Sequence, residues 1–346
     1  MTTLLLSGLA LTAAVCASLT TVVIPLLRRA RVVDVPGDRS LHRTPVPRGG
    51  GLAIVLAASL ATWATVLAAV HRHDTVHSLT GLGLALMGLA TVLAFALLGL
   101  IEDLFSVSVR ARLVLQLVLG AGLGLVAHSA FEVSLWWTPA ICVGTAALVN
   151  ATNFMDGANG LACGHALLTS LWYVQVAILA PVPGLGLVMV SVAGACLGFL
   201  PFNTPRAKVF LGDSGSYALG SAWAFAVTAC LAQGVAVEAA LAPVLVLLAD
   251  TGYTLWKRLR AGQCWYAPHR LHVYQRLVCA GWPHWASALL VTLAAAACSA
   301  LAASSLLTSN RLWMPQVAMA AVLILYLKMP SIIGAPNPFP TLRGAR

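Results

Sequence analysis

Runs of about twenty apolar residues recur along the whole chain, and they constrain its fold more than any other feature. A helix of roughly 20 such residues spans the hydrocarbon core of a bilayer. Hydrophobic residues make up 60% of the 346-residue sequence and charged residues only 9%, which excludes an ordinary soluble enzyme and a disordered chain. We therefore predict an all-α, polytopic membrane protein with about 11 transmembrane helices, at 4–27, 50–70, 78–101, 112–128, 134–150, 162–180, 184–201, 215–232, 237–256, 285–306 and 312–328.

The positive charges predict how these spans are oriented. Short cytoplasmic loops carry an excess of Lys and Arg. With eleven spans and the N-terminus outside, every Lys and Arg falls on the inside except Arg72 and Arg311. We expect an outside N-terminus and a cytoplasmic C-terminus. The first apolar run has its basic residues after it, so we expect it to remain as an anchor rather than to be removed as a signal peptide.

The cysteines and the connecting segments indicate no second domain. The eight cysteines are scattered, mostly within the predicted spans, and include no CxxC pair. We interpret them as small apolar residues rather than as disulfides or a metal cluster. No linker or repeat interrupts the chain, so residues 1–346 are predicted to form a single transmembrane domain.

The inside segment 34–51 is rich in proline, glycine and basic residues. Its prolines and glycines predict a rigid, non-helical loop, and Arg39, His42, Arg43 and Arg48 make that loop basic. A positive-inside loop would explain the arginines but not the Pro-Val-Pro-Arg-Gly-Gly-Gly ending. Exposed backbone N–H groups and guanidinium groups both bind phosphate, so we predict an anion site here.

Two further segments place acids and amides at the inner ends of predicted spans. Glu102 and Asp103 end the third span, where two acids are costly unless water, a metal ion or another cation compensates them. An interfacial helix cap is the alternative. Asn150, Asn153 and Asp156 recur every three residues, so a helical turn would place all three on one face. An amide-capped helix end is the alternative there.

Two more acids lie later in the chain. Asp213 stands between glycines and hydroxyls at the start of an apolar helix, shortly after Asn203, although such residues also make ordinary helix caps. Asp250 lies inside the ninth span about two turns before Lys257, so an ion pair with Lys257 or Arg258 is the simplest interpretation.

The inside loop 257–284 contains His269, Arg270, His272 and Arg276. Two histidines three residues apart could share a helix face and bind a metal ion. Beside two arginines, however, we favour a phosphate or a nucleotide as the ligand.

Taken together, these segments describe one pocket. Carboxylates at the inner ends of several spans suit Mg²⁺, which takes oxygen ligands and bridges to substrate phosphates. Basic, glycine-rich loops around them suit a diphosphate. A pocket with both, at the membrane surface, favours phosphoryl transfer between a water-soluble donor and a molecule in the lipid.

The segments resemble those of the bacterial polyprenyl-phosphate N-acetylhexosamine-1-phosphate transferases, or glycosyltransferase family 4, which include the phospho-N-acetylmuramoyl-pentapeptide transferase. The similarity covers residues 34–276 in the family's order. The motifs are Arg39-Ser-Leu-His42-x-x-Pro-x-Pro-Arg48-Gly-Gly, Glu102-Asp103, Asn150-x-x-Asn153-x-x-Asp156-Gly-x-x-Gly160-Leu, Phe210-Leu-Gly-Asp213-Ser-Gly-Ser and His269-x-x-His272-x-Tyr-Gln-Arg-Leu. The last motif resembles the branch that begins O-antigen and capsule units.

The resemblance implies a magnesium-dependent reaction, with Mn²⁺ as an alternative ion. In it, undecaprenyl phosphate attacks the β-phosphorus of a UDP-N-acetylhexosamine and UMP leaves. The implied setting is the cytoplasmic face of the bacterial inner (cell) membrane. The implied partners are these two substrates, the lipid bilayer and, since dimers occur in the family, a second copy of the chain; no nucleic acid is expected.

Residue roles carry over by position only. The resemblance implies Asp213 as the principal Mg²⁺ ligand with Asp156 beside it, and Glu102, Asp103, Asp156 and Asp213 as catalytic acids. The implied substrate-binding residues are Arg48, Asn150, Asn153, Asn203, Asp250, His269, Arg270 and His272. The active site would be formed by the loops 28–49, 102–111, 151–161, 202–214 and 257–284.

Two positions depart from the family pattern. Glu102 stands where the family has the first Asp of a pair, and Asn159 stands where many members have an acid. Members of the O-antigen branch often have Asn at the second position, which argues against the peptidoglycan precursor as substrate.

Two other classes of protein share some of these features. A secondary transporter would also have many spans, but its polar residues should lie near the midplane on inverted repeats. A membrane phosphatase or pyrophosphatase acting on polyprenyl phosphates would use similar acids. It would not need the amide-rich 150–156 segment to bind a nucleotide.

Overall fold

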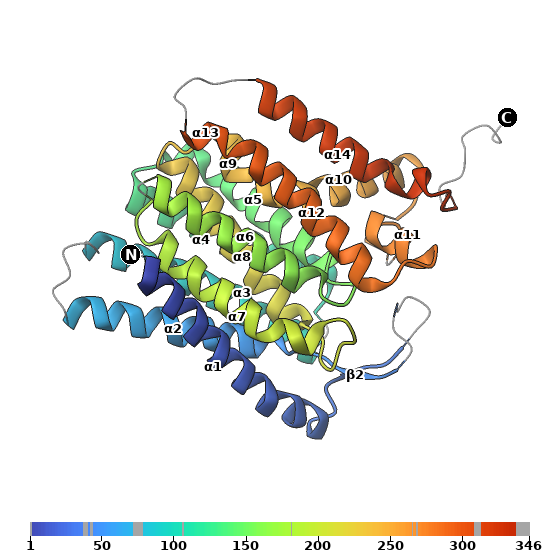
Figure 1. Cartoon of the computed structure of the whole chain (residues 1–346), viewed down its shortest axis with the longest axis horizontal. Coiled ribbons are helices and arrows are strands. Elements are labelled where there is room, and N and C mark those ends of the chain that lie inside the picture. Colours follow the sequence, from blue (N-terminus) through green and yellow to red (C-terminus); the bar gives the residue numbers. More distant parts are fainter. Residues whose placement is uncertain are drawn as a thin grey trace.

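The chain folds into a bundle of long helices, which confirms the predicted all-α membrane fold (Figure 1). The computed structural model describes residues 2–36, 41, 44–71, 79–105, 107–180, 182–264, 266–267, 269–307 and 313–336. Its elements are α1 (Thr2–Arg29), β1 (Val33–Asp34), β2 (Val46–Pro47), α2 (Gly51–His71), α3 (Leu79–Phe105), α4 (Val109–Phe131), η1 (Leu135–Trp137), α5 (Thr138–Phe154), α6 (Leu161–Leu179), α7 (Leu185–Asn203), α8 (Gly212–Ala232), α9 (Val237–Leu241), η2 (Ala242–Val244), α10 (Leu245–Arg260), α11 (Val273–Cys279), α12 (His284–Ala302), α13 (Ser304–Leu307) and α14 (Met314–Ile332).

The number of membrane-length helices differs from the predicted eleven. Among the described residues, ten helical segments are long and apolar enough to cross a bilayer. The span predicted at 134–150 corresponds to η1 and α5, and α5 has only 17 residues. At 1.5 Å per residue such a helix extends about 25 Å, less than the roughly 30 Å of a bilayer core. It packs between α4 and α8. The orientation of the termini stays a prediction.

The predicted span 237–256 lies within one helical segment of membrane length, Val237–Arg260. Inside it, the short 3-10 turn η2, which contains Pro243, joins α9 to α10. A 3-10 turn replaces some of the usual helical hydrogen bonds, and inside a membrane other groups have to satisfy the freed carbonyls. Here α6 supplies them: the Tyr173 hydroxyl donates to the Ala240 carbonyl at 2.8 Å, and His165 Nε2 lies 2.8 Å from the Pro243 carbonyl.

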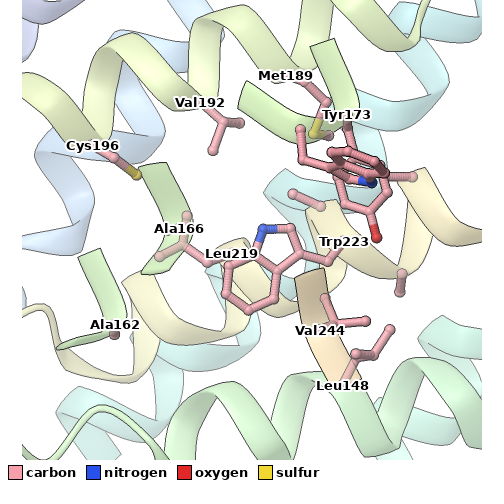
Figure 2. Close-up of a cluster of buried hydrophobic side chains, with 14 of the residues drawn as sticks. Leu148, Ala162, Ala166, Tyr173, Met189, Val192, Cys196, Leu219, Trp223 and Val244 are labelled. Atoms are coloured by element: carbon pink, nitrogen blue, oxygen red, sulfur yellow. The ribbon is translucent and has the colours of Figure 1, made fainter. Parts of the chain in front are cut away.

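Helix α8 forms the centre of the bundle. Trp223 of α8 is fully buried, and Figure 2 shows it beside side chains of α6 and α7. The labelled neighbours are Leu148, Ala162, Ala166, Tyr173, Met189, Val192, Cys196, Leu219 and Val244. Nearly every residue of α8 from Gly212 to Cys230 is buried, so the helix gives the residues at its start a rigid support.

The segment 34–51, predicted to be a rigid, non-helical loop, takes part in a two-stranded antiparallel ladder. Val33 pairs with Pro47 and Asp34 with Val46. Beyond β2 the chain pairs with the residues before α8, through a parallel bridge from Arg48 to Phe210 and a 2.8 Å bond from the Gly50 N–H to the Phe210 carbonyl. This pairing fixes Arg48 beside the first turn of α8.

Two glycines allow α2 and α3 to approach the start of α8 closely. A Cβ atom on Gly99 of α3 would overlap the Asp213 carbonyl oxygen, and one on Gly51 of α2 would overlap Gly215. Because Gly99 lies one helical turn before Asp103, this approach brings the Asp103 carboxylate to the first turn of α8.

The eight cysteines are all free thiols. Five are buried, namely Cys16, Cys163, Cys196, Cys230 and Cys298, whereas Cys264 and Cys279 are exposed. The interpretation as small apolar residues agrees with the burial of those five. That residues 1–346 form a single domain stays a prediction.

The close approach of α3 to α8 at Gly99 predicts that the same substitution changes stability in opposite directions at two places on α3. Gly99→Ala should destabilise the protein by about 1 to 3 kcal/mol, since the added methyl group forces α3 away from α8. Gly83→Ala is the matched control, because nothing lies within 4 Å of a Cβ there. It should stabilise by about 0.5 to 1 kcal/mol through helix propensity. Thermal unfolding in detergent measures both; a loss of stability in Gly83→Ala equal to that in Gly99→Ala would contradict the packing argument.

Candidate active site

A polar cavity of about 380 Å³ opens at one end of the bundle. The β-hairpin, α11 and the end of α7 meet at this end, which is opposite the N-terminus in Figure 1. The charged residues that line the cavity are Asp34, Arg48, Asp156 and Asp213, and the neutral polar residues are Asn153, Asn159, Asn203, Gln275 and His284. The structure therefore gathers residues from most of the predicted inside loops around one cavity.

Arg48 joins two of the predicted acids. Its Nε lies 2.9 Å from Asp103 Oδ1, and its terminal nitrogen Nη2 lies 2.8 Å from Asp213 Oδ2. Burial acts to lower the pKa of the Arg48 guanidinium, but the carboxylates of Asp213 and Asp103 more than offset it, so the pKa is raised. Arg48 is therefore a permanent cation at the mouth of the cavity, and its side chain remains 37% exposed to a ligand.

Asp103 also holds the first turn of α8. Its Oδ1 accepts the Asp213 N–H at 3.0 Å, and its Oδ2 accepts the Ser214 N–H at 2.9 Å. A carboxylate at a helix N-terminus satisfies unpaired N–H groups and interacts favourably with the helix dipole. One carboxylate therefore fixes both Arg48 and the backbone that carries Asp213. The sequence predicted Asp103 as a site residue, but it borders the cavity through Arg48 rather than lining it.

Asn153 and Asp156 complete the acidic side of the cavity. Asn153 Nδ2 donates to Asp213 Oδ1 at 2.7 Å and to Ser216 Oγ at 3.1 Å. Helix α5 ends at Phe154, so Asp156 lies in the turn just beyond the helix. Burial, followed by the charge of Asp213, raises the pKa of Asp156 well above its usual value. Three carboxylates crowd this region with Arg48 as their shared cation.

Two predicted site residues have partners away from the cavity. Glu102 Oε1 lies 3.3 Å from Arg112 Nη1, and Glu102 Oε2 accepts the Val107 N–H at 3.1 Å. Asn150 Nδ2 donates to Gln116 Oε1 of α4 at 2.5 Å. The helical spacing of Asn150, Asn153 and Asp156 therefore does not bring all three to the cavity.

Asn203 lines the cavity and also joins two loops. Its Oδ1 accepts the Gly160 N–H at 2.8 Å, and its Nδ2 donates to the Val209 carbonyl at 3.1 Å. Gly160 has a φ of +78°, a conformation that favours glycine. Asn203 thus holds the turn after Asp156 against the segment that leads to α8.

The loop before α11 places its predicted residues behind the cavity wall. His272 is the residue before α11 and is 3% exposed. Its Nδ1 lies 3.1 Å from Asp250 Oδ1, so the carboxylate of Asp250 bonds to this loop rather than forming the predicted ion pair with Lys257 or Arg258. His269 and Arg270 precede α11 and are also not among the described cavity-lining residues.

Several residues for which the sequence predicted no role take part in the site; Gln275 and Ser216 lie within the quoted motifs, and His284 lies outside them. Gln275 and His284 line the cavity, and His284 Nδ1 accepts the Asn159 N–H at 3.3 Å. Ser216 supports Asn153. A lone amide within an apolar span, as at Gln116, could have signalled a polar partner on a neighbouring helix.

Some predicted residues of the first loop lie outside the described residues. They are Arg39, His42 and Arg43. Their predicted contribution to the basic loop stays a prediction.

The protonation of His269 predicts how stability depends on pH. Burial, followed by the charges of His272 and Arg258, lowers its pKa from 6.5 to about 4. Between these values the unfolded chain binds a proton that the folded protein does not, so stability falls as the pH drops from 7 to 5. His269→Gln should remove about 1 kcal/mol of that loss. Thermal unfolding in detergent at both pH values measures it, and an equal loss in wild type and variant would contradict the assignment.

Comparisons with known proteins relate this chain to one family. A family model described as Glycosyl transferase family 4 matches residues 85–231. The decaprenyl-phosphate N-acetylglucosaminephosphotransferase of Mycobacterium leprae is 32% identical over 307 residues, which cover 78% of this chain and 75% of the relative. A probable undecaprenyl-phosphate N-acetylglucosaminyl 1-phosphate transferase of Bacillus subtilis is 28% identical over 80% of this chain and 79% of its own. A phospho-N-acetylmuramoyl-pentapeptide-transferase of Desulforudis audaxviator is 32% identical over 58% of this chain and 68% of its own.

The fold and the comparisons together define a multi-pass membrane protein of a transferase family. The chain belongs to glycosyl transferase family 4, so the resemblance seen in its motifs is confirmed. The family match includes Asp103, Asn153, Asp156 and Asp213, whereas Arg48 and everything after α8 lie outside it.

Proposed function

We propose that the protein transfers an N-acetylhexosamine 1-phosphate from a UDP-sugar to undecaprenyl phosphate and releases UMP. This reaction would start the assembly of a lipid-linked cell-surface glycan, of the O-antigen or capsule kind. The observation that carries the proposal is the Arg48 bridge between Asp103 and Asp213, at a polar cavity beside the ends of apolar helices. The relatives named as polyprenyl-phosphate sugar-phosphate transferases support it.

The reaction brings two negatively charged phosphate groups together, and the site is suited to this. An oxygen of the lipid phosphate attacks the β-phosphorus of the UDP-sugar. The bond from this phosphorus to the oxygen bridging the two phosphates breaks, and UMP leaves with that oxygen. The main obstacle is repulsion between anions, and fixed positive charge is a common means of lowering such a barrier. Among the described residues, Arg48, held in place by two carboxylates, would contribute such charge at the cavity.

Mg²⁺ is the proposed cofactor, with Mn²⁺ as an alternative, and Asp213 and Asp156 would hold it. Both carboxylates line the cavity, and Mg²⁺ in phosphoryl-transfer sites is held by one or two carboxylates together with substrate phosphates. Burial, followed by the negative charge of Asp213, raises the pKa of Asp156, and a divalent cation would favour its charged form. When bound, the ion would supply positive charge to the transferred phosphate.

The remaining site residues take supporting roles in this proposal. Asn153 orients the Asp213 carboxylate through its 2.7 Å hydrogen bond, and Asp103 orients Arg48. His269 and Arg270 would approach the diphosphate from the loop before α11. Glu102, which is paired with Arg112, would act at a distance from the reacting groups.

The proposed setting is the cytoplasmic face of a bacterial inner membrane. The lipid substrate keeps its chain in the bilayer while its phosphate reaches the cavity, and the UDP-sugar comes from the water. We also propose that the protein forms a homodimer and that it does not bind nucleic acid.

A labelled-substrate assay tests the function. Purified protein with Mg²⁺ and a UDP-N-acetylhexosamine labelled in the uridine should release labelled UMP only when undecaprenyl phosphate is present. A panel of UDP-N-acetylglucosamine, UDP-N-acetylgalactosamine and their 6-deoxy forms identifies the donor. Release of labelled UMP without the lipid phosphate would indicate hydrolysis, and release of phosphate from the lipid alone would indicate a phosphatase.

Carboxylate substitutions test the roles at the site. Asp213→Asn removes the ion pair with Arg48 and the principal metal ligand, so UMP release should fall about a hundredfold or more, as on loss of one charge-stabilising group. Asp103→Asn should be similarly severe. Glu102→Ala is the control from the same acidic pair and should lose about tenfold or less, since its partner is Arg112. Most of the activity persisting in folded Asp213→Asn would remove the basis for the metal assignment.

A further inference from the structure

Asp250 is a fully buried carboxylate whose partners come from three helices. Its own helix α10 contributes the Thr254 hydroxyl, 3.2 Å from Oδ1. The start of α11 contributes the Val273 N–H, 3.0 Å from Oδ2, and the preceding residue contributes His272 Nδ1. Helix α14 contributes the Tyr326 hydroxyl, which donates to Oδ2 at 2.7 Å. These four groups occupy both oxygens of the carboxylate.

Asp250 needs these contacts, because burying a carboxylate costs free energy unless hydrogen bonds satisfy it. Removing one donor leaves part of the charge unsatisfied, and the nearby backbone then has to move or admit water. The part of this cluster with most freedom is the start of α11 and the non-helical segment before it, since Thr254 and Tyr326 lie within long helices. The loss of a donor should therefore appear as movement at the start of α11.

The start of α11 is connected directly to the cavity. Gln275 lines the cavity, and its Oε1 accepts the His272 N–H at 3.2 Å, which ties it to the same turn that Asp250 holds. The Tyr274 hydroxyl donates to the Phe154 carbonyl at 2.9 Å, two residues before Asp156. A displacement of this turn would therefore reach the cavity wall at two places.

We propose that Tyr326 is a positioning residue for the part of the cavity that binds the UDP-sugar. It acts through Asp250, which holds the start of α11 and thereby places Gln275. Tyr326 is 2% exposed and lies on α14, which packs against α10, α11 and α12. It is not among the described cavity-lining residues. This inference rests on the proposed function for its kinetic readout.

Tyr326→Phe tests the proposal, because it removes only the hydroxyl. The KM for the UDP-sugar that the wild type uses should rise about tenfold, near the lower limit for losing a hydrogen bond to a charged group. The kcat and the KM for undecaprenyl phosphate should stay within about twofold. Thr254→Val removes a second donor to the same carboxylate and should act in the same direction if Tyr326→Phe does not fold.

Tyr173→Phe is the matched control. Tyr173 is equally buried, and its hydroxyl also donates at 2.8 Å, but to the Ala240 carbonyl within the bundle. It should lose stability without changing the KM for the UDP-sugar. An unchanged KM in Tyr326→Phe and Thr254→Val, or the same rise in Tyr173→Phe, overturns the proposal.

Hydrogen–deuterium exchange gives a readout that needs no turnover. Peptides covering 269–279 should exchange faster in Tyr326→Phe than in wild type and Tyr173→Phe, because the Val273 N–H loses its fixed acceptor. Equal exchange in all three overturns the positioning role. If wild type releases no UMP with any UDP-sugar, the proposed function fails, and the exchange result still decides whether Tyr326 holds α11.

Discussion

The bridge from Arg48 to Asp103 and Asp213 is the interaction on which the site depends. Acids at the ends of apolar helices are costly unless a cation or N–H donors compensate them. Here a single guanidinium contacts both carboxylates, and Asp103 also accepts two N–H groups of α8. The bridge therefore joins the β-hairpin, α3 and α8, and it holds Arg48 and Asp213 on the wall of the cavity.

Close helix packing makes this bridge possible. Gly99 lets α3 contact the first turn of α8, and Gly51 lets α2 do the same from another side. A larger residue at Gly99 would separate α3 from α8, and Asp103 would no longer reach the N–H groups that it accepts, whereas one at Gly51 would separate α2 from α8. Behind this contact the buried residues around Trp223 keep α8 in place. Small residues in one layer and large residues in the next thus fix the geometry of a charged site.

The sequence predicted the acidic half of the site better than the half around α11. Asp213, Asp156 and Asn153 were identified because polar residues at the inner ends of apolar spans require a special explanation, and all three line the cavity. Asn150 has the same spacing, yet its partner is Gln116 on α4. Spacing along a helix states which residues share a face, but it does not state which neighbouring helix that face meets.

The sequence by itself determined the helical membrane fold, most of the spans and the segments that carry the chemistry. These features follow from hydrophobic length and from the cost of charge in lipid, which are local properties of the chain. Only the tertiary structure decided that the span around Pro243 contains a 3-10 turn held by α6, that Arg48 bridges two acids, and that Asp250 bonds to Tyr326 rather than to Lys257. Those outcomes depend on which helices pack together, and buried groups must find their partners across that packing.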